Sequence, residues 1–185
     1  MKLVVGISGA SGSIYGVRLL EELNRLAVDT HLVISRWGRE NIERETGRTV
    51  EAVRALASVS HEEGDLAAPI ASGSYRTDGM IVAPCSAKTL SAIANGYCDN
   101  LIARAADVTV KEGRRLVLMV REAPLSAIHL ENMLKLARLG VVIFPPVPAF
   151  YAGSRTVDEL VLQSVGRVLD GFGLLVPGFR RWAEE

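Results

Sequence analysis

Short runs of consecutive apolar residues alternate along this chain with longer segments in which apolar positions recur every three to four residues. The short runs are rich in β-branched residues and uninterrupted by polar ones, which is typical of parallel strands covered on both faces. They lie at residues 3–7, 30–34, 80–83, 116–120 and 141–144. The longer segments predict helices over residues 13–26, 36–45, 86–94, 100–111, 126–139 and 157–169, the last with Thr156 as its N-cap. This alternation predicts a doubly wound, mainly parallel α/β sheet with helices on both faces.

Residues 56–77 follow neither pattern. Small apolar residues and hydroxyls are mixed there, most clearly at residues 67–74. A flexible linker is seldom this apolar, so we predict an ordered loop with a functional role.

The composition is that of one globular domain covering residues 1–185. Apolar residues make up 49% of the chain and charged residues 23%, which separates it from disordered proteins. The 21 basic side chains balance the 21 acidic ones, so neither nucleic acid nor an anionic membrane is expected as a partner. The first apolar stretch, residues 3–7, is too short for a signal peptide, so none is expected. The longest uncharged run of the chain, residues 139–154, is short and broken by prolines, so no membrane span is expected.

Cysteine and histidine positions predict neither disulfides nor a metal site. Cys85 and Cys98 have no CxxC or zinc-type spacing, which favours a reducing, cytoplasmic setting. Cys85 is better explained as a small buried residue at a strand end than as a nucleophile. His31, His61 and His129 have no metal-ligand spacing to one another or to a cysteine.

A glycine-rich turn follows the first strand and leads directly into a helix, with Gly6, Gly9 and Gly12 at intervals of three. Small residues let a ligand approach the backbone, and the N–H groups at a helix start favour a phosphate. The turn has no P-loop lysine and no GxGxxG spacing, and the second strand ends in Ser35 and Arg36 instead of an acidic residue. These features favour a mononucleotide such as FMN over NAD. A tight turn that binds nothing remains the alternative.

A second turn of the same kind follows the strand at residues 80–83, with Ser86 suited to cap the next helix. In a doubly wound sheet the first strand of each half is central, and ligands bind beyond the carboxyl ends of these two strands. We therefore expect residues 9–12 and 86–89 to face each other across a crevice.

Charged residues follow in a part of the chain that is otherwise small and apolar. Arg104, Asp107 and Lys111 share one face of a predicted helix, where they form either a solvated ion-pair stripe or an anion site. Arg121 and Glu122 end a central strand at the same rim as the two turns, where they are either an inert surface pair or part of a site.

Two features near the carboxyl end of the chain also suggest a ligand. Arg167 lies in an apolar part of the last helix, which is costly unless the guanidinium is paired or faces an anion. Residues 145–151 are stiff, apolar and aromatic, so they either wall a hydrocarbon pocket or contact another subunit. Trp37 and Trp182 are predicted to be packing residues.

Taken in order, these segments resemble the UbiX/Pad-type flavin prenyltransferases. The resemblance runs nearly end to end and rests on GISGASGSIYGVRLL at 6–20, ASGS at 71–74, PCSAKTLSAI at 84–93, LIARAADVTVKE at 101–112 and REAPLSAIHLENMLKLARLGVVIFPPVPAFY at 121–151. It implies a flavodoxin-like or Rossmann-like subunit that assembles into a dodecamer, with FMN near the subunit boundaries.

The resemblance also implies a role for each matching residue. The FMN-binding residues are Gly9, Ala10, Ser11, Ser35, Ser86, Ala87, Lys88, Thr89 and Arg121. The catalytic residues are Glu122, Glu45 and Ser11. The prenyl phosphate is bound by Ser72, Arg104, Lys111, Tyr151 and Arg167. Where some members carry a tryptophan over the prenyl site, this chain has Leu66.

The implied reaction joins a dimethylallyl group from dimethylallyl phosphate to N5 and then C6 of reduced FMN, without a metal. Glu122 is expected to move the C6 proton, with support from Glu45. The product, prenylated FMN, would serve a UbiD-type decarboxylase. Two alternatives remain: an FMN-dependent decarboxylase of the peptidyl-cysteine type, whose PASANT-like motif and catalytic histidine are not found here, and a non-enzymatic FMN-binding electron carrier.

Overall fold

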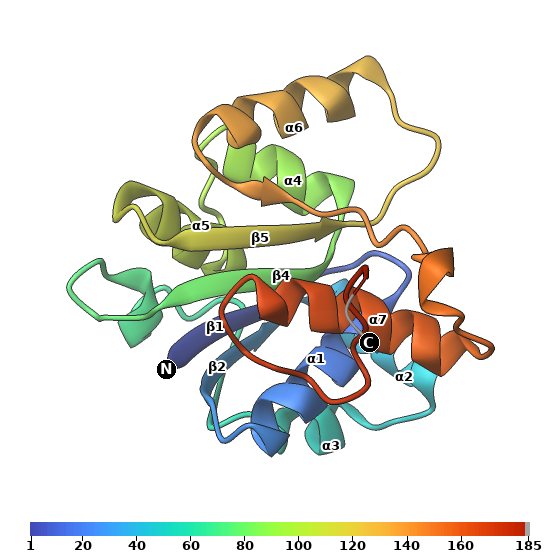
Figure 1. Cartoon of the computed structure of the whole chain (residues 1–185). Helices are drawn as coiled ribbons and strands as arrows, with labels where there is room; N and C mark the ends of the chain where they lie inside the picture. Colours follow the sequence, from blue (N-terminus) through green and yellow to red (C-terminus); the bar gives the residue numbers. More distant parts are fainter. Residues whose placement is uncertain (184–185) are drawn as a thin grey trace.

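Six parallel strands form one sheet in the order β3-β2-β1-β4-β5-β6, with β1 and β4 at its centre (Figure 1). The structure is a computed structural model that describes residues 1–183. The strands are β1 (Lys2–Ile7), β2 (Asp29–Ile34), β3 (Val59–His61), β4 (Gly79–Cys85), β5 (Arg115–Val120) and β6 (Val142–Ile143). The order reverses between β1 and β4, as a doubly wound sheet requires.

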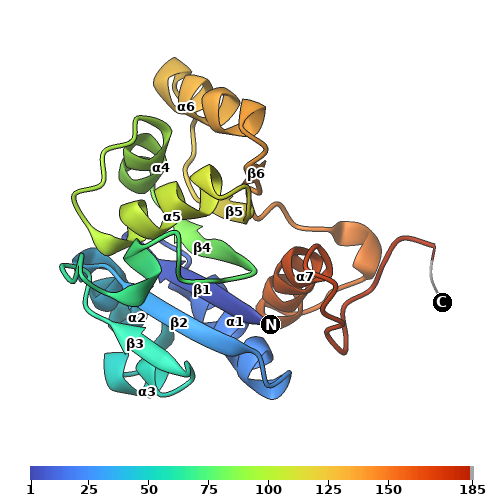
Figure 2. The same cartoon turned by 90° about the vertical axis from the view of Figure 1, so that its left-hand side faces the viewer.

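Helices cover both faces of the sheet (Figure 2). They are α1 (Ser13–Arg25), α2 (Arg36–Thr46), α3 (Val50–Arg54), α4 (Ala87–Ala94), α5 (Leu101–Lys111), α6 (Ala127–Arg138) and α7 (Val157–Asp170), with 3-10 helices η1 (Pro69–Ala71) and η2 (Phe150–Ala152). Alternate residues of β1 supply two separate cores: Val5 packs on the side of α1, α2, α3 and α7, and Val4 packs on the side of α4, α5 and α6.

The predicted fold class is confirmed, and so are the five predicted strands and six predicted helices, with shifts of a few residues at their ends. The sequence reasoning missed β3, α3 and the two 3-10 helices. Residues 56–77 contain β3 and η1, and hydrogen bonds from Arg104 and Arg114 to backbone carbonyls hold this segment in place. Its prediction as an ordered loop is confirmed.

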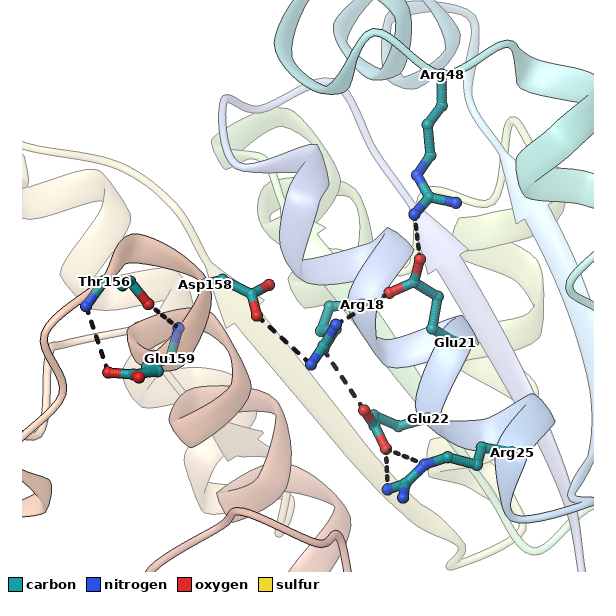
Figure 3. Close-up of polar contacts among 8 residues, drawn as sticks. All are labelled: Arg18, Glu21, Glu22, Arg25, Arg48, Thr156, Asp158 and Glu159. Carbon is teal, nitrogen blue, oxygen red and sulfur yellow. Dashed lines mark hydrogen bonds and ion pairs between the residues drawn. The ribbon is translucent and has the colours of Figure 1, made fainter.

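A network of charged side chains ties α7 to α1 (Figure 3). Arg18 of α1 lies between Glu21 and Glu22 of the same helix, at 3.4 and 3.5 Å, and reaches Asp158 of α7 at 3.6 Å. Glu22 also pairs with Arg25, and Glu21 with Arg48. The same end of α7 is closed by a capping box between Thr156 and Glu159, which confirms the predicted N-cap. The last helix is therefore anchored on the face that α1 covers.

Two tryptophans lie elsewhere than predicted. Trp37 is 60% exposed and Trp182 is 74% exposed, so their assignment as packing residues is wrong for this chain alone. Cys85 is buried as expected, and burial raises the pKa of its thiol. Within residues 1–183 no helix is long and apolar enough to cross a membrane, and no group of three or more potential metal-ligating side chains comes together.

Candidate functional site

The two glycine- and serine-rich turns meet at the carboxyl edge of β1 and β4. The hydroxyl of Ser8 donates to the carbonyl of Pro84 at 2.8 Å and accepts from the backbone N–H of Ser86, also at 2.8 Å. The backbone of Arg121 in turn donates to the carbonyl of Cys85 at 3.0 Å. These bonds join the ends of three neighbouring strands, and the prediction that the turns face each other is confirmed.

Two adjoining cavities open between the turns, with volumes of about 550 and 300 Å³. Every residue predicted to bind FMN lines at least one of them: Gly9, Ala10, Ser11, Ser35, Ser86, Ala87, Lys88, Thr89 and Arg121. Gly9 and Glu122 line both cavities, so they stand where the two spaces join.

Two helix N-termini point into the larger cavity, which we call the flavin cleft. Ser35 caps α2 by accepting from the Gly38 N–H at 3.0 Å, and Ser86 caps α4 by accepting from the Thr89 N–H at 3.2 Å. Helix N-termini and backbone N–H groups favour a phosphate, and the exposed ammonium of Lys88 adds a positive charge.

Gly9 allows the first turn to pack closely against the start of α2. A β-carbon at Gly9 would collide with Trp37 at the start of α2, so only glycine lets this helix and the turn approach each other. The cavity beside the turn is lined by small residues and by the N-termini of α2 and α4. The residues present therefore fit a mononucleotide such as FMN.

Some residues of the flavin cleft were not predicted. Arg36, Trp37, Glu63 and Asn100 also line it, and Glu63 accepts from the Arg36 N–H at 2.8 Å. Arg36 and Trp37 directly follow a predicted strand, so the rule that sites lie at carboxyl ends of strands could have found them. Glu63 follows β3, which the sequence pattern did not reveal.

Glu45 lies behind the first turn and does not line either cavity. Its Oε2 accepts from the backbone N–H groups of Gly12 and Ser13, at 2.9 and 2.8 Å, and from the Ser13 hydroxyl at 2.7 Å. Partial burial alone would raise the pKa of Glu45, but these hydrogen bonds outweigh it and lower the pKa. The carboxylate is thus held as an anion at the start of α1.

Arg104, Lys111 and Ser72 come together on the α5 side of the sheet. Arg104 pairs with Asp107 at 2.8 Å and donates through Nε to the carbonyl of Ala71 at 3.0 Å. Lys111 pairs with Glu112. A β-carbon at position 73 would lie 2.6 Å from the Lys111 ammonium, so residues 71–73 lie beside both cations. The Arg104 and Lys111 side chains keep 36% and 47% of their surface exposed, which leaves both open to an anion.

Tyr151 and Arg167 lie on the other face of the sheet, with η2 and α7. Arg167 is 61% exposed and pairs with Asp170 at 3.0 Å, so the guanidinium has a partner, as the sequence analysis required. Its apolar neighbours face the core while its own side chain points outward. Tyr151 is 52% exposed, and its ring contacts that of Trp182 edge-on at 5.3 Å. Within one chain, helix α5, which carries Arg104 and Lys111, and helix α7, which carries Arg167, cover opposite faces of the sheet (Figure 2).

Known proteins share most of this sequence and its fold. A model of the Flavoprotein family matches residues 1–169. The chain is 59% identical to a probable UbiX-like flavin prenyltransferase of Streptomyces sp. (strain D7) over 184 residues, which are 99% of this chain and 92% of the relative.

Solved structures agree with these matches. A protein from Escherichia coli O157:H7, described as a dodecameric FMN-dependent UbiX-like decarboxylase, has a TM-score of 0.97 at 57% identity, with all of both chains covered. AnUbiX, solved with FMN and dimethylallyl pyrophosphate, has a TM-score of 0.97 at 54% identity over 100% of this chain and 98% of that one. The peptidyl-cysteine decarboxylase EpiD, at 17% identity and a TM-score of 0.66, shares the fold alone. The chain belongs to the flavoprotein family and, within it, to the UbiX-like flavin prenyltransferases.

Proposed function

We propose that this chain joins the dimethylallyl group of dimethylallyl phosphate to reduced FMN, without a metal, and releases prenylated FMN. The observation that carries this proposal is the position of Glu122, a carboxylate at the junction of the flavin cleft with a second cavity. An electron carrier needs no acid or base at such a junction. A ring-forming alkylation of the flavin does need one, because a ring proton must leave.

Each part of the site has a role in this reaction. The N-termini of α2 and α4, with Ser35, Lys88 and Thr89, hold the FMN phosphate. Residues 9–11 and Arg121 hold the ring system, so that Glu122 stands beside the reacting edge. Reduced flavin supplies the nucleophile that takes the allylic carbon. As the second bond forms, the prenyl double bond must gain a proton and the ring carbon must lose one, and Glu122 accepts the proton that the ring loses.

The phosphate of the prenyl donor needs cations that stabilise it as it leaves. We propose that Arg104, Lys111 and Ser72 of one subunit meet Tyr151 and Arg167 of another around this group. The support is that the two sets lie on opposite faces of the sheet, while the side chains of Tyr151 and Arg167 point outward and are exposed.

Such a shared site requires assembly, and a homo-dodecamer is our proposal for this chain. Support comes from large apolar side chains left exposed, which a lone subunit would not need. On α6 and the segment that follows it, Ile128 is 68% exposed, Val147 72% and Phe150 80%. The dodecameric relative from Escherichia coli O157:H7 agrees with this assembly.

We assign residues 1–185 to a single flavin-binding domain that works in the cytoplasm, consistent with two unpaired cysteines. The product would pass to a UbiD-type decarboxylase.

The direct test is an anaerobic incubation of the protein with reduced FMN and dimethylallyl phosphate, followed by mass spectrometry of the flavin. We expect the flavin mass to rise by one C5H8 unit. A parallel incubation with the diphosphate identifies the donor. Recovery of unmodified flavin with both donors would rule the proposed reaction out.

A further inference from the structure

A carboxylate occupies a part of the flavin cleft that would otherwise attract an anion. The N-terminus of α2 lines this cleft, and the N-terminus of a helix carries a partial positive charge. The backbone N–H of Arg36, the first residue of α2, already donates to Oε2 of Glu63 at 2.8 Å. The Ser35 hydroxyl accepts from the Gly38 N–H. Acceptors within this chain therefore bind two of the first three N–H groups of α2.

The N-terminus of α4, in the same cleft, differs from that of α2. Within residues 1–183, the N–H groups of Ser86 and Thr89 donate to serine hydroxyls and not to a carboxylate. The exposed ammonium of Lys88 adds a positive charge there. A phosphate inside a cavity of about 550 Å³ lies within roughly one Debye length of a carboxylate in its wall, so the two charges repel each other. A flavin phosphate is therefore attracted at α4 and repelled by Glu63 at α2.

The segment that carries Glu63 is held in place on both sides. The Glu63 carbonyl accepts from the N–H of Leu101, at the start of α5, at 2.8 Å. The preceding residue, Glu62, pairs with Arg39 of α2 and with Arg54 of α3. Glu62 does not line the cleft, whereas Glu63 does, and no ion pair within residues 1–183 involves Glu63. The negative charge in the cleft wall is therefore fixed in position and unpaired.

We infer that Glu63 competes with the flavin phosphate for the N-terminus of α2, and that its charge weakens the binding of FMN and of prenylated FMN but not of riboflavin. A phosphate must either displace the carboxylate from the Arg36 N–H or bind beside it, and both cost affinity. Riboflavin has the same ring system without the phosphate, so it avoids this cost. The inference rests on the proposed place of the FMN phosphate. It deepens the proposed function, because a product that a second enzyme consumes must leave the cleft.

Glu63→Gln separates the charge of this side chain from its hydrogen bond. Glutamine keeps an oxygen that accepts from the Arg36 N–H, but it carries no charge that repels a phosphate. We expect the Kd for FMN to fall by about three- to tenfold at low salt, and the Kd for riboflavin to stay within about twofold of the parent value. The gain for FMN should shrink at high salt because the repulsion is screened. Titrations followed by flavin fluorescence measure both constants.

Two further variants complete this test. Glu63→Ala removes the charge and also frees the Arg36 N–H, so it should bind FMN more tightly than the parent as well. Glu43→Gln removes an exposed carboxylate of α2 that does not line the cleft, and it should leave both Kd values unchanged. An unchanged or higher Kd for FMN in both Glu63 variants, or an equal gain for riboflavin, would overturn the inference. A parent protein that binds neither flavin would overturn the proposed flavin site, and this inference with it.

Discussion

The flavin cleft and the C-terminal region differ in how far one chain completes them. At the cleft, Ser8 bonds to both Pro84 and Ser86, so both turns are fixed before any ligand arrives. In the C-terminal region, the side chains of Tyr151 and Arg167 are exposed, and they contact Trp182 and Asp170, respectively. The flavin cleft is thus a pocket formed within one chain, whereas the C-terminal region is an exposed surface.

The exposed side chains of the C-terminal region do not result from a loosely attached α7. Arg18 links α7 to α1 through Asp158 (Figure 3), and the side chain of Gln163 donates to the Arg180 carbonyl at 2.6 Å while accepting from the Arg180 N–H at 3.1 Å. A firmly held helix that presents an arginine and a neighbouring tyrosine outward is expected at a subunit boundary. In the proposed assembly, the flavin half of the site belongs to one chain and the phosphate half is shared by two.

The largest effect should come from the carboxylate at the junction. Glu122→Gln keeps the shape of the side chain but cannot accept a proton, so formation of prenylated FMN should slow by about 10²-fold or more. Binding of FMN should change by no more than about twofold, because the other cleft residues remain. Stopped-flow spectra and flavin mass over time measure the rate. An unchanged rate would remove Glu122 from the chemistry.

Smaller losses are expected for the phosphate half. Lys111→Ala and Arg167→Ala each remove one charge-assisted hydrogen bond, so each should raise KM for the prenyl phosphate by about 10- to 100-fold. The Kd for FMN should stay near the parent value in both variants. Arg44→Ala removes an exposed arginine of α2 and serves as the control. An equal loss of affinity for FMN and for the prenyl phosphate would mean that these cations bind the flavin phosphate. The two ligands would then not be bound by separate halves of the site.

A chain of hydrogen-bonded side chains links strands β1, β2 and β3 through Tyr75. Lys2 donates to the Tyr75 hydroxyl at 2.7 Å, this hydroxyl lies 3.0 Å from Nε2 of His31, and Nδ1 of His31 lies 2.9 Å from Nε2 of His61. An ammonium only donates, so Tyr75 directs its own hydrogen to His31, which in turn donates to His61. Both rings are then neutral, and a further proton would break a hydrogen bond.

Burial lowers the pKa of both histidines in this chain of bonds. For His31 the neighbouring His61 and Lys2 lower the pKa further, against the opposing effect of Asp29; for His61 only Asp65 opposes burial. The unfolded chain therefore takes up protons first as the pH falls below the ordinary value of 6.5. The free energy of unfolding should begin to decrease there and stop decreasing once the pH is below the folded-state pKa values.

The smallest predicted effect is this loss of stability, on the order of 1 kcal/mol, between about pH 7.5 and about pH 5. Urea unfolding at the two pH values measures it. Replacing both histidines by glutamine should flatten the dependence, whereas Tyr75→Phe should lower stability at both pH values and keep the dependence. A parent protein with equal stability at both pH values, or an unchanged slope in the double variant, would contradict this assignment.

The flavin half was predictable because each of its turns directly follows a continuous apolar strand, and parallel strands end at one edge. Glu45 was assigned by resemblance, but its contacts depend on how α2 packs against α1, which no local pattern encodes. The His31–His61 contact was missed because it depends on the pairing of β2 with β3. β3 has only three residues, two of them exposed, so it leaves no apolar run.

The exposure of Arg167 was, by contrast, visible in the sequence. The core of α7 is formed by Val161, Val165 and Val168, at helical spacings of four and three. Arg167 lies outside this apolar stripe. Its apolar neighbours in the sequence therefore do not imply that its own side chain is buried. Which residues of another copy it meets cannot be read from a single chain.

Mixing two defective variants tests most directly whether the phosphate half is built from two chains. Lys111→Ala and Arg167→Ala subunits are unfolded together, refolded as mixed assemblies, and assayed for prenylated FMN. If each site takes Lys111 from one subunit and Arg167 from another, random mixing leaves roughly one quarter of the sites intact, and activity should recover to about that fraction of the parent's. Mixed assemblies verified by native mass spectrometry that stay as inactive as the separate variants would contradict a shared site.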